Sequence, residues 1–294
     1  MSAITDPNAG MPPGTRSHVA GDARPSFMRG QLTAFAWLGH LRSSEERQAG
    51  TGSPDIFDHL AQKAADEPWD SSSPAEHGSL ATLKHYVTWT FERALTTQSV
   101  VPNSDSSMCV FNTGLMTPQH EDIHGIFHPN LNSGRQDWYL RGWRVAGDSP
   151  LDTFPELPPA VTYSEDPYPY LFDWDLPLKF TARNFTVAVA DLFPAALKEI
   201  PFGLELALEA SVDRAIKLAK RHPGTAVPAW QPDKAEIQLL LPLSLVNPRK
   251  PDAVLVIARG DMTYRSTAIV PPAEAYKAAR LITRPTARWL DPCG

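Results

Sequence analysis

The sequence has little cysteine, little charge and no long apolar run. Its two cysteines, Cys109 and Cys293, form neither a disulfide framework nor a zinc-ribbon spacing. No apolar run reaches the length of about 18 residues that a membrane helix needs, and residues 1–30 lack the apolar core of a signal peptide. We therefore expect a soluble protein in a reducing, cytoplasmic setting, away from membranes.

Charge and motifs exclude further classes. Charged residues make up 20% of the chain and the net charge is −6, which argues against salt-driven nucleic-acid binding over the whole surface. These values do not exclude a local basic groove, because net charge does not give the distribution of charge. The sequence contains no G-x-S-x-G motif, no P-loop and no dinucleotide fingerprint, so it identifies no cofactor and no serine-hydrolase machinery.

What is present predicts an α+β fold. Apolar residues make up 42% of the chain, which is enough for a substantial core. Residues 1–32 are rich in glycine, proline and small polar residues and predict a flexible tail. Residues 33–292 predict a single domain, with a mostly antiparallel sheet and packed helices.

The C-terminal third has the clearest pattern. Leu204, Leu208 and Val212 share one face of a helix over residues 203–222. A three-strand meander and a last helix follow, so the predicted order of elements is helix, three strands, helix. The three strands are expected at residues 235–245, 253–258 and 262–270.

In the rest of the chain, helices are expected at residues 54–65, 79–95 and 118–127. Strands are expected there at residues 107–111 and 137–145.

The stretch VFNTGL, followed by Thr117-Pro118, predicts a strand, a glycine turn and a helix start. Asn112 and Gly114 tolerate positive φ, and Thr117 is a good N-cap. Such a geometry points free backbone N–H groups at one place, which attracts phosphate or carboxylate. The alternative is a turn that simply joins two elements. The candidate phosphate-binding residues are Asn112, Thr113, Gly114 and Thr117.

HEDIH, at residues 120–124, matches the H-E-x-x-H pattern of zinc peptidases. His120 and His124 would then be ligands on one helix face, with Glu121 activating water. The motif would lie in the first turn of a short helix, and no third ligand follows at the usual spacing. We therefore favour a structural role and predict no metal site.

Four residues near the C-terminus combine rings and positive charge: Tyr264, Arg265, Tyr276 and Arg280. Tyr276 and Arg280 are four apart on the last helix and share a face. With Tyr264 and Arg265 they would stack a base and bind a phosphate. The alternative, which we favour, is that Tyr276 packs in the core while Arg280 forms a structural ion pair.

Two other patterns are candidates for a binding site. Tyr139, Arg141 and Trp143 alternate on one predicted strand. Either one face of this strand is a binding platform or all three side chains simply cover the sheet, and we favour the second. Asp173 and Asp175 flank Trp174 in a proline-rich stretch, where paired carboxylates can hold magnesium. Two solvated aspartates are the commoner outcome.

Several stretches together resemble a known family, the domain of unknown function 3825. They are DHLAQKAADEPW, LKHYVTWTFERAL, VFNTGL, QLLLPLSL with DAVLVI, and YRSTAIVPPAEAYKAARLITRP closing on Trp289-Leu290. The resemblance covers roughly residues 33–292. It implies a single intracellular domain, sometimes found beside predicted RNA-binding modules. It also implies that FNTGL and a Glu121–Ile123 pair matter, and not two histidines.

These observations leave three functional hypotheses. The leading one is an RNA- or nucleotide-directed domain that also hydrolyses phosphate esters. The second is a non-catalytic module that binds RNA or a nucleotide. The third is a zinc-dependent hydrolase, which needs His120, His124 and a third ligand to meet at one point.

Overall fold

The structure is a computed structural model that describes residues 31–70, 79–132, 136–186, 192, 201–248 and 250–290. The tail predicted at residues 1–32 lies outside these ranges except for its last two residues, which begin helix α1 (Gln31–Phe35). Within the described residues, no helix combines the length and the apolar composition needed to cross a bilayer.

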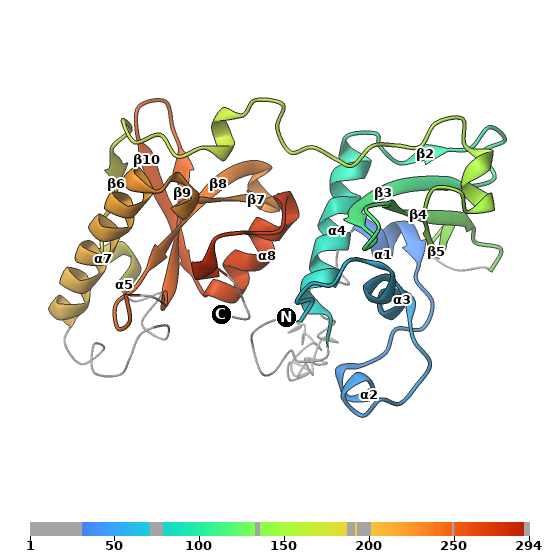
Figure 1. Cartoon of the computed structure of the whole chain (residues 1–294), viewed down its shortest axis with the longest axis horizontal. Helices are drawn as coiled ribbons and strands as arrows, with labels where there is room; N and C mark the ends of the chain where they lie inside the picture. The colour runs from blue at the N-terminus through green and yellow to red at the C-terminus, as the bar shows by residue number, and fades with distance from the viewer. Residues whose placement is uncertain are drawn as a thin grey trace, which may run out of the picture.

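Two five-stranded sheets, each with its own helices, lie side by side as an N-terminal and a C-terminal lobe (Figure 1). The first sheet has the order β1-β5-β4-β3-β2 and the second β6-β10-β9-β8-β7. β1 pairs with β5, and β6 with β10, in parallel, and the other pairs are antiparallel. The predicted α+β class with mostly antiparallel strands is therefore confirmed.

In the N-terminal lobe the strands are β1 (Ala36–Trp37), β2 (Val101–Pro102), β3 (Cys109–Met116), β4 (Asp122–Pro129) and β5 (Trp138–Arg144). The other helices of this lobe are α2 (Ser44–Gln48), α3 (Ile56–Lys63) and α4 (Ala81–Thr96), followed by the 3₁₀ turn η3 (Ser149–Thr153). Helix α3 begins two residues later than expected, because Asp55 is its N-cap and accepts the Phe57 and Asp58 N–H groups in a capping box.

In the C-terminal lobe the strands are β6 (Leu178–Lys179), β7 (Val227–Gln231), β8 (Glu236–Leu243), β9 (Ala253–Arg259) and β10 (Tyr264–Val270). The helices are α5 (Arg183–Thr186), α7 (Pro201–Arg221) and α8 (Pro272–Ile282). Short 3₁₀ turns occur at η4 (Tyr168–Tyr170), η6 (Pro223–Thr225), η7 (Pro232–Lys234) and η8 (Arg288–Leu290).

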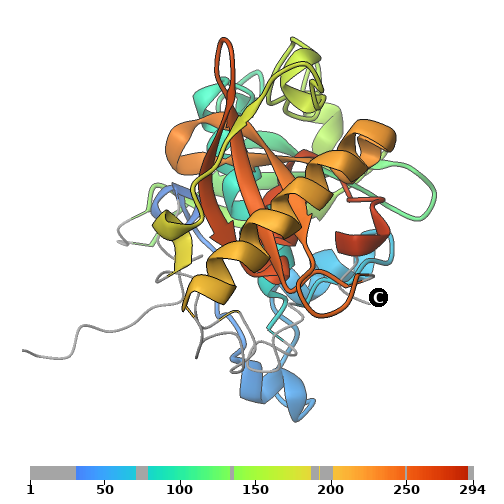
Figure 2. The same cartoon turned by 90° about the vertical axis from the view of Figure 1, so that its left-hand side faces the viewer.

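The predicted helix, meander and helix of this lobe are confirmed, and β7 adds a strand before the meander. Helix α7 crosses one face of the sheet (Figure 2), where Leu204, Leu208 and Val212 are buried against β8 and β9. Helix α8 covers the other face, with Ala275 and Ala279 in a separate core cluster. Each face of the sheet is thus covered by one amphipathic helix.

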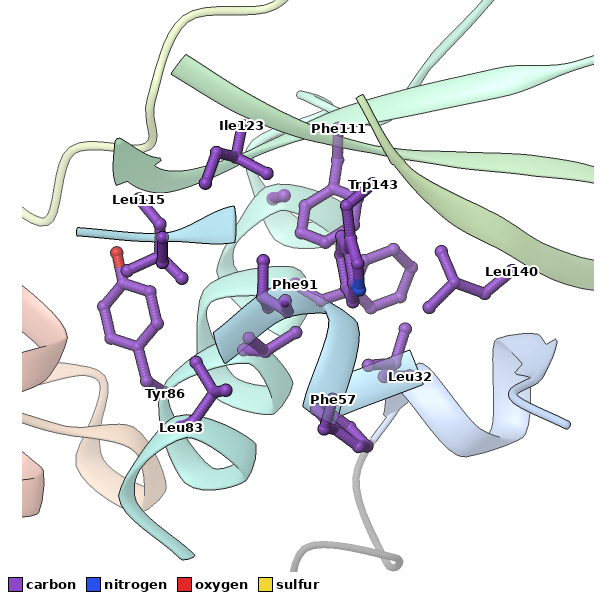
Figure 3. Packing of buried hydrophobic residues seen from close by; sticks show 14 of the residues in the cluster. Leu32, Phe57, Leu83, Tyr86, Phe91, Phe111, Leu115, Ile123, Leu140 and Trp143 are labelled. Carbon is purple, nitrogen blue, oxygen red and sulfur yellow. The ribbon is translucent and has the colours of Figure 1, made fainter. Parts of the chain in front are cut away.

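The core of the N-terminal lobe is aromatic. Helix α4 and the sheet enclose Phe91, Phe111 and Phe127, whose ring centroids lie 5.0–5.7 Å apart. Figure 3 shows Phe91 and Phe111 in this core. α1 and α3 cover the same face of the sheet through Leu32 and Phe57. The opposite face is covered only in part, by Leu151 and Phe154 on and beside η3 over the middle strands.

The helix predicted at residues 118–127 is wrong. β3 runs through NTGL to Met116, and β4 begins at Asp122, so the segment is a β-hairpin. The Thr117 hydroxyl accepts the Gln119 and Glu121 N–H groups across the turn, and His120 takes φ 64°. The Thr-Pro signal therefore serves a turn, a use open to the same residue types.

Candidate functional site

The predicted phosphate-binding residues use their polar groups inside the fold. Asn112 is buried; its amide donates to Asp122 (3.0 Å) and to the Pro158 carbonyl (3.2 Å), and its oxygen accepts the Gly114 N–H (2.8 Å). The Thr113 hydroxyl, also buried, donates to the Ile123 carbonyl at 2.6 Å. The strand–turn–helix geometry expected here is therefore wrong, and ligand contact by these residues stays a prediction.

Gly114 has a packing role. It has φ +70°, and a Cβ built on it would lie 2.6 Å from the Tyr86 hydroxyl oxygen of α4. The ring of Tyr86 in turn lies 4.4 Å from the Arg280 guanidinium carbon. The two segments that the sequence singled out, NTGL and the last helix, thus both lie against one buried tyrosine.

Arg280 and Tyr276 bind the same carboxylate. The Arg280 Nε donates to Glu67, its Nη2 donates to Glu67 Oε2 at 3.0 Å, and the Tyr276 hydroxyl donates to Glu67 Oε1 at 3.2 Å. Burial, and then Glu67, raise the pKa of Tyr276, which keeps its hydroxyl protonated as a donor. The Glu67 and Arg280 side chains are 6% and 9% exposed. This is the structural ion pair, and it joins the two lobes.

Tyr264 and Arg265 do not join this group. Tyr264 is fully buried, stacks on Phe172 at 5.4 Å, and its hydroxyl accepts the Asp173 N–H at 2.8 Å. It lies on the α7 face of the sheet, whereas Tyr276 packs on the α8 face. Arg265 is exposed. The four predicted base-and-phosphate residues therefore do not share one cleft.

The HEDIH histidines lie in the hairpin. His120 is exposed in the turn, and His124 is buried on β4, where burial lowers its pKa. No group of three His, Cys, Asp or Glu side chains in the described ranges is placed to hold a metal ion. The zinc hypothesis loses the helix on which its ligand geometry depends.

An exposed set of rings lies elsewhere, on the open part of the N-terminal sheet. Trp37 on β1 pairs with Tyr139 on β5, and Tyr139 pairs with His128 on β4. Directly paired residues point to the same face of a sheet, so these three form a row across three strands. Their rings line a hollow of about 470 Å³ that the loop at residues 130–132 borders. We call this surface the ring platform.

The ring platform is open and positively charged. Trp37 is 46% exposed, and its ring lies 5.3 Å from that of Tyr139. Arg141, two residues beyond Tyr139 on the same strand, is exposed and lines the hollow, and no carboxylate is among the lining residues. Burial, and then the charges of Arg141 and Arg144, lower the pKa of His128. His128 is therefore neutral at pH 7, and the arginines supply the charge.

Part of the ring platform was visible in the sequence. Tyr139, Arg141 and Trp143 occupy every second position of one strand, but in the structure only Tyr139 and Arg141 face the hollow, whereas Trp143 is buried in the core. Trp37 and His128 could not be added from spacing, because they lie on other strands. Their alignment depends on the pairing of β1 and β4 with β5.

Comparison with known proteins agrees with the resemblance seen in the sequence. The chain is an α+β protein, and a family model described as domain of unknown function (DUF3825) matches residues 60–289. The chain belongs to this family. No curated protein and no solved structure matches it.

Proposed function

We propose that this protein binds single-stranded RNA or a nucleotide on the ring platform. The observation that carries the proposal is the row of Trp37, Tyr139 and His128 with Arg141 beside it. Flat rings stack on nucleobases of any sequence, and a neighbouring arginine binds the phosphate. The local positive charge makes this surface suitable for an anion although the whole chain carries −6.

The arrangement supports binding and not hydrolysis. Among the described residues that line the hollow, His128 is the one imidazole and its pKa is lowered, and none is a carboxylate that could act with it or hold a metal ion. The ring platform therefore favours the second hypothesis, a non-catalytic module for RNA or a nucleotide.

The test is fluorescence anisotropy with a labelled oligouridine of about eight nucleotides, a length within the range that one such surface covers. Tyr139→Ala and Trp37→Ala each remove a stacking ring, so each should weaken binding by about 1–3 kcal/mol. Arg141→Ala should weaken binding and reduce the dependence of log K on log salt by about one. Uridine monophosphate as competitor separates a nucleotide site from an RNA site.

Arg265→Ala is the matched control, because it removes one exposed arginine from the other lobe. Affinity should stay unchanged in this variant. Equal losses in Arg141→Ala and Arg265→Ala would mean that binding follows total charge, and the ring platform would then have no special role. Absence of binding by both the oligonucleotide and the monophosphate at low salt would refute the proposal.

A further inference from the structure

A second cavity lies in the C-terminal lobe, away from the ring platform. It has a volume of about 580 Å³ and is enclosed by residues 168–175, by the η6 turn after α7, and by the start of β7. This volume falls in the range of small-molecule sites. The stretch that encloses it is the proline- and aromatic-rich segment with no helix or strand period.

The walls of this cavity are aromatic. Tyr168 and Trp174 line it and are 64% and 53% exposed, while Phe172 is buried between the cavity and the core, stacked on Tyr264. The cavity thus has exposed rings at its border and a buried ring, Phe172, among its lining residues. Flat apolar walls of this kind accept a flat apolar ligand.

One cationic side chain, Arg259, lines the cavity. Arg259 Nη2 donates to Asp173 Oδ2 at 2.7 Å, and the guanidinium carbon lies 5.7 Å from the Tyr168 ring centroid. The Arg259 side chain is 31% exposed and lines the cavity. Its guanidinium has N–H groups besides the one bonded to Asp173, so it can donate a hydrogen bond to an oxygen supplied by a ligand.

The charges decide which oxygen fits. Asp173 neutralises Arg259, and Asp175 adds a second carboxylate to the lining. An anionic ligand would meet a net negative wall, whereas a neutral carbonyl oxygen can accept a hydrogen bond from the Arg259 guanidinium without that cost. Magnesium between Asp173 and Asp175 is not favoured, because Asp173 is already paired with Arg259.

We propose that this cavity binds a neutral, planar heteroaromatic ring that carries a carbonyl oxygen, as nucleobases of the hypoxanthine, guanine and uracil type do. The ring lies against Tyr168 and Trp174, and the carbonyl oxygen accepts a hydrogen bond from the Arg259 guanidinium. This site is independent of the ring platform and of the RNA proposal.

The experiment is isothermal titration calorimetry of the full chain with inosine, guanosine and uridine. Purine riboside, which is inosine without the carbonyl oxygen, is the matched ligand and should bind about 10- to 100-fold more weakly than inosine, as expected for loss of one hydrogen bond to a charged donor. Inosine monophosphate should bind no more tightly than inosine.

Arg259→Gln should reduce inosine affinity about 10-fold or more. Because this change also unpairs Asp173, Trp174→Ala provides a second test on an exposed ring that leaves the ion pair in place. Trp174→Ala should weaken inosine binding and keep the melting temperature. Failure of all three nucleosides to bind, equal binding of inosine and purine riboside, or tighter binding of the monophosphate would each overturn the proposal.

Discussion

Gly114→Ala tests whether NTGL is a packing motif. Gly114 has φ +70°, and the new Cβ would lie 2.6 Å from the Tyr86 hydroxyl oxygen. The left-handed backbone alone costs an alanine about 1–2 kcal/mol. Displacing a buried side chain adds about 1–3 kcal/mol. We therefore expect the free energy of unfolding to fall by about 2–5 kcal/mol, measured by urea denaturation with the m-value checked for constancy.

Two matched variants separate the causes. Gly50 has φ +65°, and a Cβ added there would have no atom within 4 Å, so Gly50→Ala should show the backbone cost alone, about 1–2 kcal/mol. Tyr86→Phe removes the oxygen that the Cβ meets. In that background Gly114→Ala should also cost about 1–2 kcal/mol, and the difference between the two backgrounds is the coupling energy of the pair.

A small loss would refute this reasoning. If Gly114→Ala costs no more than Gly50→Ala, the close approach of Tyr86 does not constrain this position. If the cost is large but persists in the Tyr86→Phe background, the strain comes from the backbone or another neighbour. A third result, normal stability with lost ligand binding, would favour the phosphate-binding role predicted for NTGL.

Two further predictions concern the interface between the lobes. Glu67→Gln leaves Arg280 buried without a counter-charge, so the free energy of unfolding measured in urea should fall by about 3–5 kcal/mol. The control is Glu45→Gln on α2, which removes an exposed carboxylate and should change the free energy of unfolding little. Equal effects of the two substitutions would contradict the ion-pair role of Glu67. Burial, and then the charge of Lys277, lower the pKa of His85 from 6.5 to about 4. Between these pH values the unfolded chain takes up a proton that the folded chain does not. The free energy of unfolding therefore falls as pH falls through this window, by about 2 kcal/mol or less because the residue is not fully buried. Between pH 7 and pH 4 the melting temperature of His85→Gln should therefore fall less steeply than that of the unsubstituted protein. An equal fall in the two proteins would contradict this role of His85.

Local pattern determined the C-terminal helices and the central strands of the meander. Helices α7 and α8 were predictable because their apolar positions repeat at helical spacing, whereas β8 and β9 are continuous apolar runs bounded by turn residues. Residues 118–127 were not, because Ile123, Ile126 and Phe127 fit a helix as well as a strand. Pairing with β3 and β5 decided between the two, and those hydrogen bonds are not local.

The candidate sites depended on tertiary structure to a greater extent. Residue types alone marked Arg280 and Tyr276 as a shared face, but their carboxylate partner Glu67 lies 213 residues from Arg280. The row of Trp37, Tyr139 and His128 exists because three strands bring distant residues into one register. Sequence determined which side chains are available; only the folded chain decided which of them are used internally and which stay exposed to a ligand.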